Sequence, residues 1–152
     1  MKLLEKFENF IVLVFLGMMF VILLFQIILR YFFNHPLIWS EELARYLFVW
    51  VAFIGASFGV RDSSHIKLTV IFNFFSKKLR TVISASTNIV CILFFLYLIP
   101  DSIRLAADQF SVASSAIGLP MGLVFLAVPV GFVLMTIRLL IDTIGLFRKT
   151  TQ

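Results

Sequence analysis

The sequence predicts an all-α integral membrane protein with four transmembrane helices and an amphipathic helix on the cytoplasmic membrane surface. Of the 152 residues, 61% are hydrophobic and only 14% are charged, whereas a soluble domain is about half apolar and a quarter charged. Nineteen phenylalanines are too many for one soluble core of this size to bury. The chain shows no internal repeat and no domain boundary, so we expect residues 1–152 to form a single membrane domain.

The first span is predicted at residues 10–29, a run of 20 uncharged residues. As a helix, this run is about 30 Å long and matches the hydrocarbon core of a bilayer. A secretory signal has a shorter apolar region that ends in a small-residue cleavage site, whereas this run leads into RYFFNHP. We therefore expect it to be retained as a transmembrane helix.

Three further apolar runs predict spans at residues 43–60, 82–99 and 119–141. The last of these contains Pro129 and Gly131. Because proline has no N–H to donate to the preceding turn, these two residues predict a local kink in the fourth span.

Two of the connecting segments have patterns of their own. Residues 66–80 carry apolar side chains at helical spacing on one face and polar or basic ones on the other. About 15 residues are too few to cross a bilayer, so this segment is expected to form an amphipathic helix in the cytoplasmic interface. The segment SVASSAIGLP at 111–120 consists mainly of small residues and is expected to be flexible.

The distribution of basic residues predicts the orientation in the membrane. Ten of the thirteen lysines and arginines lie before the first span, between the second and third spans, or at the end of the chain. Since cytoplasmic loops are enriched in Lys and Arg, both termini are expected in the cytoplasm. The net charge of +5 is divided among short connections, so it does not indicate nucleic-acid binding.

Three charges stand together in the stretch IWSEELARYLFVW, at the start of the second span. Ser40 is a suitable N-cap, and it would place Glu41 and Glu42 in the first helical turn, where the helix dipole favours carboxylates. Arg45 follows four residues after Glu41 and three after Glu42, so it is expected to pair with either one.

A helical projection of the second span separates two faces. At about 100° per residue, one stripe contains Glu41, Arg45, Phe48, Ala52 and Gly59, and Gly55 and Ala56 flank it. The small residues are Ala52, Gly55, Ala56 and Gly59, and they include a GxxxG spacing. Aromatic residues, among them Trp39, Tyr46 and Trp50, lie on the opposite face. Small residues let helices approach closely in lipid, so the stripe predicts a contact with another helix, while Trp39 and Tyr46 fit an aromatic belt at the interface.

The sequence gives no sign of a catalytic, metal-binding or substrate site in this chain. Transporters place ionisable groups near the bilayer midplane, and the middles of the four predicted spans have none. The polar pair Ser84 and Asn88 in the third span is expected to make hydrogen bonds between helices. The alternatives are a membrane anchor of a respiratory-type complex or a small multidrug exporter. A haem anchor would need histidines inside the bundle, but His35 and His65 lie in connecting segments.

Three segments together resemble the small permease subunit (DctQ-like) of TRAP transporters. They are LRYFFNHPLIWSEELARYLFVWVAFIGAS, GVRDSSHIKLTVI and IGLPMGLVFLAVPVGFVLMTIR, in that order. The resemblance implies a non-enzymatic, multi-pass subunit of the bacterial inner membrane without a cofactor of its own. It also implies a stable partner, the large permease subunit, which carries the substrate and sodium sites and moves as an elevator. A periplasmic substrate-binding protein would be the transient partner, and the solute would be an organic acid such as a C4-dicarboxylate or sialic acid.

On this resemblance the small subunit is a fixed scaffold in contact with membrane lipid, and it helps to form the docking surface for the binding protein. Glu41, Glu42 and Arg45 would organise the periplasmic end of the second span and its contact with the large subunit. Arg61 and His65 would lie at the cytoplasmic interface, either as membrane-surface residues or in contact with a partner.

Overall fold

The computed structural model describes residues 2–35, 37–66 and 77–150. Four long helices form an elongated bundle: α1 (Lys2–Phe32), α2 (Ile38–Ile66), α4 (Lys77–Asp108) and α6 (Ala127–Thr150). The helices η1 (Gln109–Ser111) and α5 (Gly122–Phe125) are short and flank the connection between α4 and α6. Within the described ranges, a single isolated bridge between Ala113 and Pro120 is the only β pairing, so the all-α prediction is confirmed.

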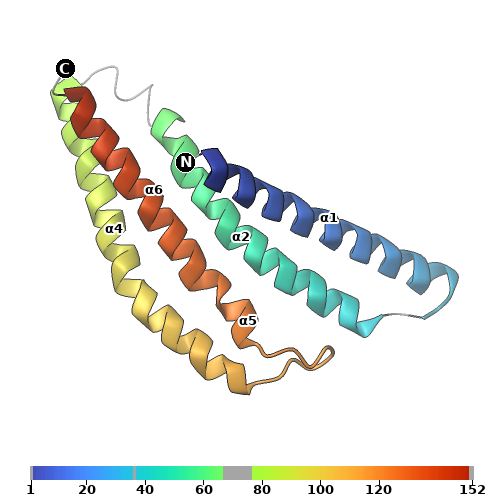
Figure 1. The fold of residues 1–152 in the computed structure, drawn as a ribbon. Coiled ribbons are helices and arrows are strands. Elements are labelled where there is room, and N and C mark those ends of the chain that lie inside the picture. The colour runs from blue at the N-terminus through green and yellow to red at the C-terminus, as the bar shows by residue number, and fades with distance from the viewer. Residues whose placement is uncertain (1, 36, 67–76, 151–152) are drawn as a thin grey trace.

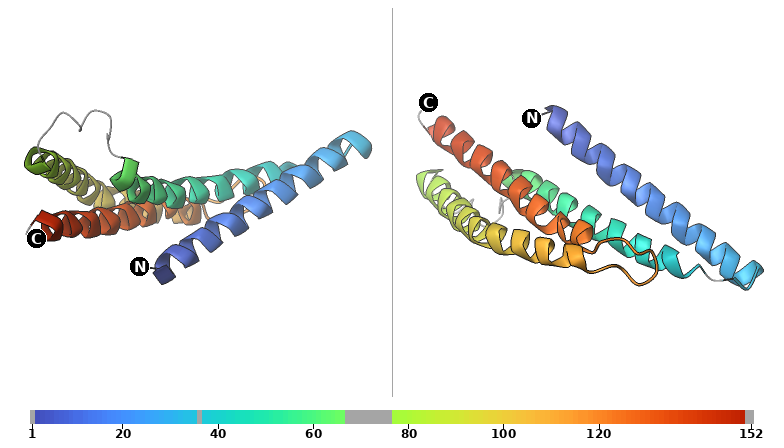
Figure 2. Two further views of the ribbon diagram at one scale, coloured as in Figure 1. Left: turned by 90° about the horizontal axis from the view of Figure 1, so that it is seen from above. Right: turned by 60° about the horizontal axis from the view of Figure 1, so that its bottom comes forward.

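The helices pack in the order α1, α2, α6 and α4 (Figure 1). The α6 helix lies between α2 and α4, whereas α1 packs chiefly against α2 and forms one edge of the bundle (Figure 2). The start of α1 and the end of α6 lie at one end, which we call the terminal end, and the end of α1, the start of α2 and the connection 112–121 lie at the other, the turn end (Figure 1). This arrangement agrees with an even number of spans, and the assignment of the terminal end to the cytoplasm stays a prediction from charge.

Among the described residues, four helices are long and apolar enough to cross a membrane, as the sequence predicted. They are the segments Lys6–Phe32, Ile38–Val60, Thr81–Ser111 and Gly122–Leu146. Each includes nearly all of the predicted span, and the third continues about twelve residues beyond the predicted end. Most of the predicted interfacial helix, residues 67–76, lies outside the described residues. Its first residue, Ile66, is the last residue of α2, and residues 77–80 open α4.

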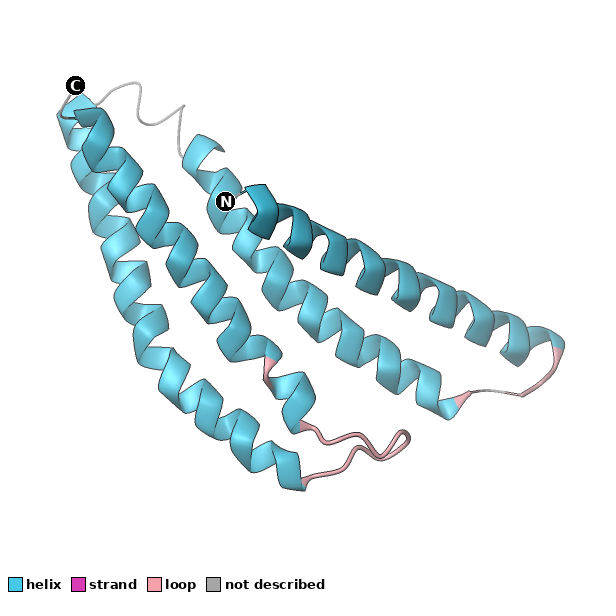
Figure 3. Ribbon diagram, in the orientation of Figure 1, coloured by secondary structure: helices cyan, strands magenta, loops and turns pink. Residues whose placement is uncertain are grey.

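Two prolines affect the helices differently. Pro100 lies inside α4, which continues to Asp108 and curves along its length (Figure 1). Pro129 cannot donate a hydrogen bond to the carbonyl of Phe125, and the helix is interrupted between α5 and α6 at Leu126 (Figure 3). The predicted kink in the fourth span is therefore present as a break just before Pro129.

The bundle core depends on a close approach between α2 and α6. A Cβ atom added to Gly131 would lie 2.9 Å from the Phe53 Cβ and 3.1 Å from its carbonyl oxygen, so only glycine fits without a shift. The next residue, Phe132, contacts aromatic rings on both sides. Its ring packs edge-on against Phe53 at 6.1 Å and stacks with Phe95 at 5.5 Å between centroids. These rings join α2, α6 and α4 in one core.

Candidate partner interface

The first turns of α2 do not have the predicted capping geometry. The helix begins at Ile38, two residues before the predicted N-cap. Ser40 is fully buried, and its hydroxyl donates a hydrogen bond to the Leu37 carbonyl at 2.6 Å. The predicted N-cap is therefore wrong, because the serine side chain donates to a carbonyl three residues earlier and does not accept from an N–H of the helix.

Glu41 and Glu42 bind different parts of the chain. Gln26 of α1 donates a hydrogen bond from Nε2 to Glu41 Oε1 at 2.7 Å, and Gln26 itself is buried. Glu42 Oε2 accepts hydrogen bonds from the backbone N–H groups of Ala116 and Ile117, at 2.8 and 3.0 Å. Hydrogen bonds to a carboxylate are stronger than neutral ones. Glu41 therefore joins α2 to α1, and Glu42 joins α2 to the connection between α4 and α6.

A second side chain of α2 supports the Glu42 contact. The Tyr46 hydroxyl donates to Glu42 Oε1 at 2.5 Å and lies 3.2 Å from the Met121 sulfur. Tyr46 is buried, so its predicted place in an interfacial aromatic belt is wrong. Of the other aromatic candidates, Trp39 is exposed and Trp50 is half-buried.

The connection 112–121 is an ordered turn. Backbone hydrogen bonds join Ser114 N–H to the Leu119 carbonyl and Met121 N–H to the Val112 carbonyl, both at 2.8 Å. The buried Ser114 hydroxyl accepts from the Leu119 N–H at 3.1 Å, and Gly118 takes the left-handed conformation, with a φ of 74°. The expected flexibility of this small-residue segment is wrong, because cross-turn bonds and the Glu42 carboxylate satisfy its backbone groups.

Arg45 does not form the predicted ion pair. Its side chain is exposed, and it makes no salt bridge with Glu41, Glu42 or any other residue that the structure describes. The reason is geometric: both carboxylates turn toward donors on other segments, Gln26 and the turn at 112–121.

The predicted small-residue stripe of α2 lies open along the helix. Glu41 and Arg45 are exposed, and so are the next residues of the stripe: Phe48, Ala52, Ala56 and Gly59. Gly55 is half-buried, and a Cβ atom added to Gly55 or Gly59 would meet no heavy atom within 4 Å. The other face of α2 is buried in the bundle through Ala44, Leu47, Ile54 and Ser57. Within the described part of the chain, the helix face that the sequence predicts for close helix contact is therefore uncovered.

Arg61 and His65 fall in the last turns of α2, which continues through Ile66. Their side chains are outside the described part of the structure, so their predicted interfacial role stays a prediction.

The structure also reveals two polar contacts near the terminal end. Asn88 of α4 donates from Nδ2 to Asp142 Oδ2 at 3.0 Å and to Thr143 Oγ1 at 3.2 Å, both on α6. The interhelical role expected for Asn88 is confirmed. The second contact is an ion pair between buried Glu8 of α1 and Arg138 of α6, which the sequence analysis missed. Glu8 is the last charge before one apolar run and Arg138 interrupts another, and their opposite signs were the available signal.

Comparison with known proteins identifies the family. A family model described as "Tripartite ATP-independent periplasmic transporters, DctQ component" matches residues 19–149. The chain belongs to the DctQ family. It is therefore a membrane component of a transporter and not an enzyme, and it is a multi-pass protein of the bacterial inner membrane. Neither the respiratory anchor nor the multidrug exporter gains any support.

Individual relatives are similar along most of this DctQ chain. The C4-dicarboxylate TRAP transporter small permease protein DctQ of Vibrio cholerae is 26% identical over 90% of this chain and 69% of its own length. A putative TRAP transporter small permease protein of Haemophilus influenzae is 30% identical over 85% of this chain and 82% of its own. The sialic acid TRAP transporter permease protein SiaT of Haemophilus influenzae is 33% identical over 91% of this chain. This match covers only 22% of SiaT.

Proposed function

We propose that this chain is the fixed scaffold of a sodium-coupled TRAP transporter and holds a large permease subunit against the exposed stripe of α2. The observation that carries the proposal is the open face from Phe48 to Gly59, with room for a side chain at Gly55 and Gly59. Small residues on a lipid-facing surface gain little from lipid, but they let a second helix approach closely. The large subunit would supply that helix.

The size of SiaT supports a large partner. A DctQ-like segment makes up 22% of that permease protein, so the greater part of the polypeptide is a different segment in the same chain. Covalent fusion holds two segments at a fixed ratio and a high effective concentration. We infer that this chain makes the equivalent association between separate subunits.

The charges of this chain support a scaffold role. Glu8 and Arg138 bind each other, and Glu41 and Glu42 bind Gln26 and the turn at 112–121. These contacts leave the four carboxyl and guanidinium groups engaged within the chain, which favours substrate and sodium sites in the large subunit and no cofactor here. By the names of its relatives, the solute would be an organic acid such as a C4-dicarboxylate or sialic acid.

The turn end would face the periplasm and form part of the docking surface for the substrate-binding protein. The excess of Lys and Arg near the terminal end supports this orientation. The ordering of residues 112–121 by Glu42 supports docking, because a preformed surface loses little conformational entropy when a partner binds.

Reconstitution in liposomes tests the proposal. We expect sodium-driven uptake of labelled succinate or sialic acid only when this chain, the large permease and the binding protein are all present. Vesicles that lack one component and vesicles without a sodium gradient are the controls. Uptake by this chain alone, or full uptake by the large permease and binding protein without it, would contradict the scaffold role.

A further inference from the structure

The α1 helix has little apolar burial to hold it in place. In an apolar stretch of 18 residues within Lys6–Phe32, 6% of the residues are buried within the chain, compared with 33% in a stretch of the same length within Gly122–Leu146. Among the α1 side chains that the structure describes, the buried polar ones are Glu8, near the terminal end, and Gln26, near the turn end. In lipid, apolar side chains do not drive helices together, so polar contacts and close packing decide which helices associate.

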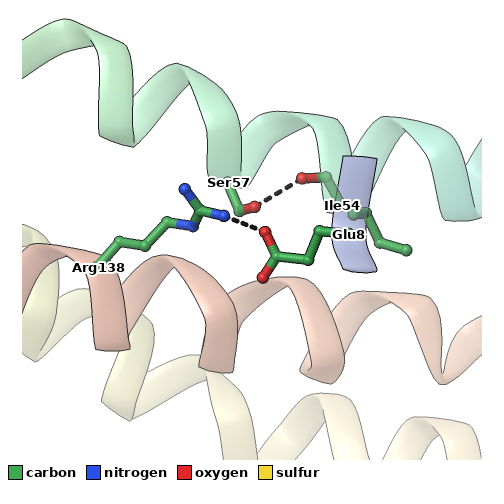
Figure 4. A network of polar contacts seen from close by, with 4 residues as sticks. All are labelled: Glu8, Ile54, Ser57 and Arg138. Atoms are coloured by element: carbon green, nitrogen blue, oxygen red, sulfur yellow. Dashed lines mark hydrogen bonds and ion pairs between the residues drawn. The ribbon is translucent and has the colours of Figure 1, made fainter. Parts of the chain in front are cut away.

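The contact at Glu8 is an ion pair across the bundle. Arg138 Nη2 of α6 donates to Glu8 Oε2, and the two side chains are 9% and 4% exposed (Figure 4). The Arg138 guanidinium also lies 5.4 Å from the centroid of the Phe58 ring on α2, within cation–π range. Three helices therefore meet at one guanidinium: α6 carries it, α1 neutralises it, and α2 provides an aromatic face.

Glu8 and Arg138 lie where each charge needs the other in order to be stable. Both residues lie inside segments long and apolar enough to span a membrane. A single unpaired charge in such a segment is costly, whereas a paired one is tolerated. Glu8 Oε1 and Arg138 Nε are buried with no hydrogen-bond partner among the described residues, so the contact between Oε2 and Nη2 is the main compensation for both groups.

We propose that Glu8 and Arg138 form a counter-charge clasp that fixes α1 against α2 and α6. The N-terminal half of α1 is then an integral part of the scaffold, and its register is set by Glu8. Gln26 and Glu41 secure the other end of the same helix. The clasp does not depend on the proposed partner, because all of its atoms belong to this chain.

Distance measurements between two spin labels test the clasp in the purified full chain in lipid nanodiscs. The labels are placed at Phe10 of α1 and Ile144 of α6, which are 64% and 62% exposed, after Cys91 is replaced by serine. We expect a narrow distance distribution in the parent protein. E8Q and R138M should each broaden the distribution by about 10 Å, one helix diameter, and lower Tm by about 5 °C or more.

The charge swap E8R/R138E separates a clasp from general damage. We expect the swap to recover the narrow distribution and at least half of the lost Tm, because it restores opposite charges at the same place. The matched control is Asp101→Asn, which removes a carboxylate from an exposed pair with Arg104 at 3.6 Å and should change neither readout.

Three results would overturn the proposal. One is an unchanged distance distribution in both E8Q and R138M. Another is a swap that accumulates and stays as broad as the single variants. The third result applies if E8Q and R138M fail to accumulate: the charge swap E8R/R138E then accumulates no better than they do.

Discussion

The two faces of α2 have opposite surroundings. On the inner face, Phe53 lies so close to α6 that position 131 has room only for glycine. On the outer face, Gly55 and Gly59 have open space in front of them. The comparison teaches that small residues in a membrane helix indicate close approach without saying whether the neighbour belongs to the same chain. Four substitutions test whether this distinction holds.

The largest effect is expected for Gly131→Leu. The added side chain would collide with the backbone and Cβ of Phe53, and overpacking of this kind costs about 1–3 kcal/mol of folding free energy. We expect a clear loss of Tm in the purified chain. The control is Gly17→Leu, where an added Cβ meets nothing within 4 Å. If both variants lose the same amount of Tm, the close approach of α2 and α6 does not stabilise the chain.

The next effect should appear only in the complex. Gly59→Leu adds bulk to the open stripe. The free energy of unfolding of the isolated chain should therefore change by no more than about 0.5 kcal/mol. Co-purification of the large permease should fall about tenfold, as expected for about 1.4 kcal/mol of lost packing. Gly17→Leu again serves as the control. If Gly59→Leu co-purifies as much large permease as the parent chain does, the partner does not bind this face.

A smaller and more local effect is expected for Glu42→Ala. Without the carboxylate, the N–H groups of Ala116 and Ile117 lose their acceptor, at a cost of about 1–2 kcal/mol. Hydrogen exchange at these two amides should accelerate about 5- to 30-fold while the helices keep their protection. Arg45→Ala, one turn further along the helix, should leave the exchange unchanged. Equal exchange in both variants would mean that Glu42 does not order the turn.

The smallest effect is expected for Glu41→Ala. The substitution removes one hydrogen bond, from Gln26 at 2.7 Å, and Glu41 is exposed, so water can replace it as the acceptor. We expect a loss of about 0.5–1 kcal/mol in the free energy of unfolding, measured by denaturant titration in detergent. A loss as large as that of Gly131→Leu would mean that the outer face of α2 also carries core packing.

Much of the fold follows from the sequence, but several residue pairings do not. The four spans follow from their apolar runs, and the break before Pro129 follows from its missing N–H donor. The pairing of Arg45 with Glu41 or Glu42 was wrong, because helical spacing reports only neighbours on the same helix. Tyr46, a partner of Glu42, lies on the same helix, but Gln26 and the turn at 112–121 come from other segments.

The same reason explains the small residues and the missed ion pair. The stripe from Ala52 to Gly59 was visible as a pattern, yet the glycines that leave no room for a Cβ atom are Gly122 and Gly131, on other helices. Glu8 and Arg138 are 130 residues apart. Their contact depends on α1 and α6 meeting at the terminal end, and helix periodicity contains no information about that meeting.

The sequence by itself determined the class of protein, the number and approximate bounds of its spans, and the face of α2 with small residues. These features depend on composition and on the helix repeat, which act over a few residues. The tertiary structure alone decided which polar groups meet: Glu42 with the turn at 112–121, and Glu8 with Arg138. Such contacts are decided by how helices distant in sequence pack, because in lipid a buried charge is stable only where the bundle brings a partner to it.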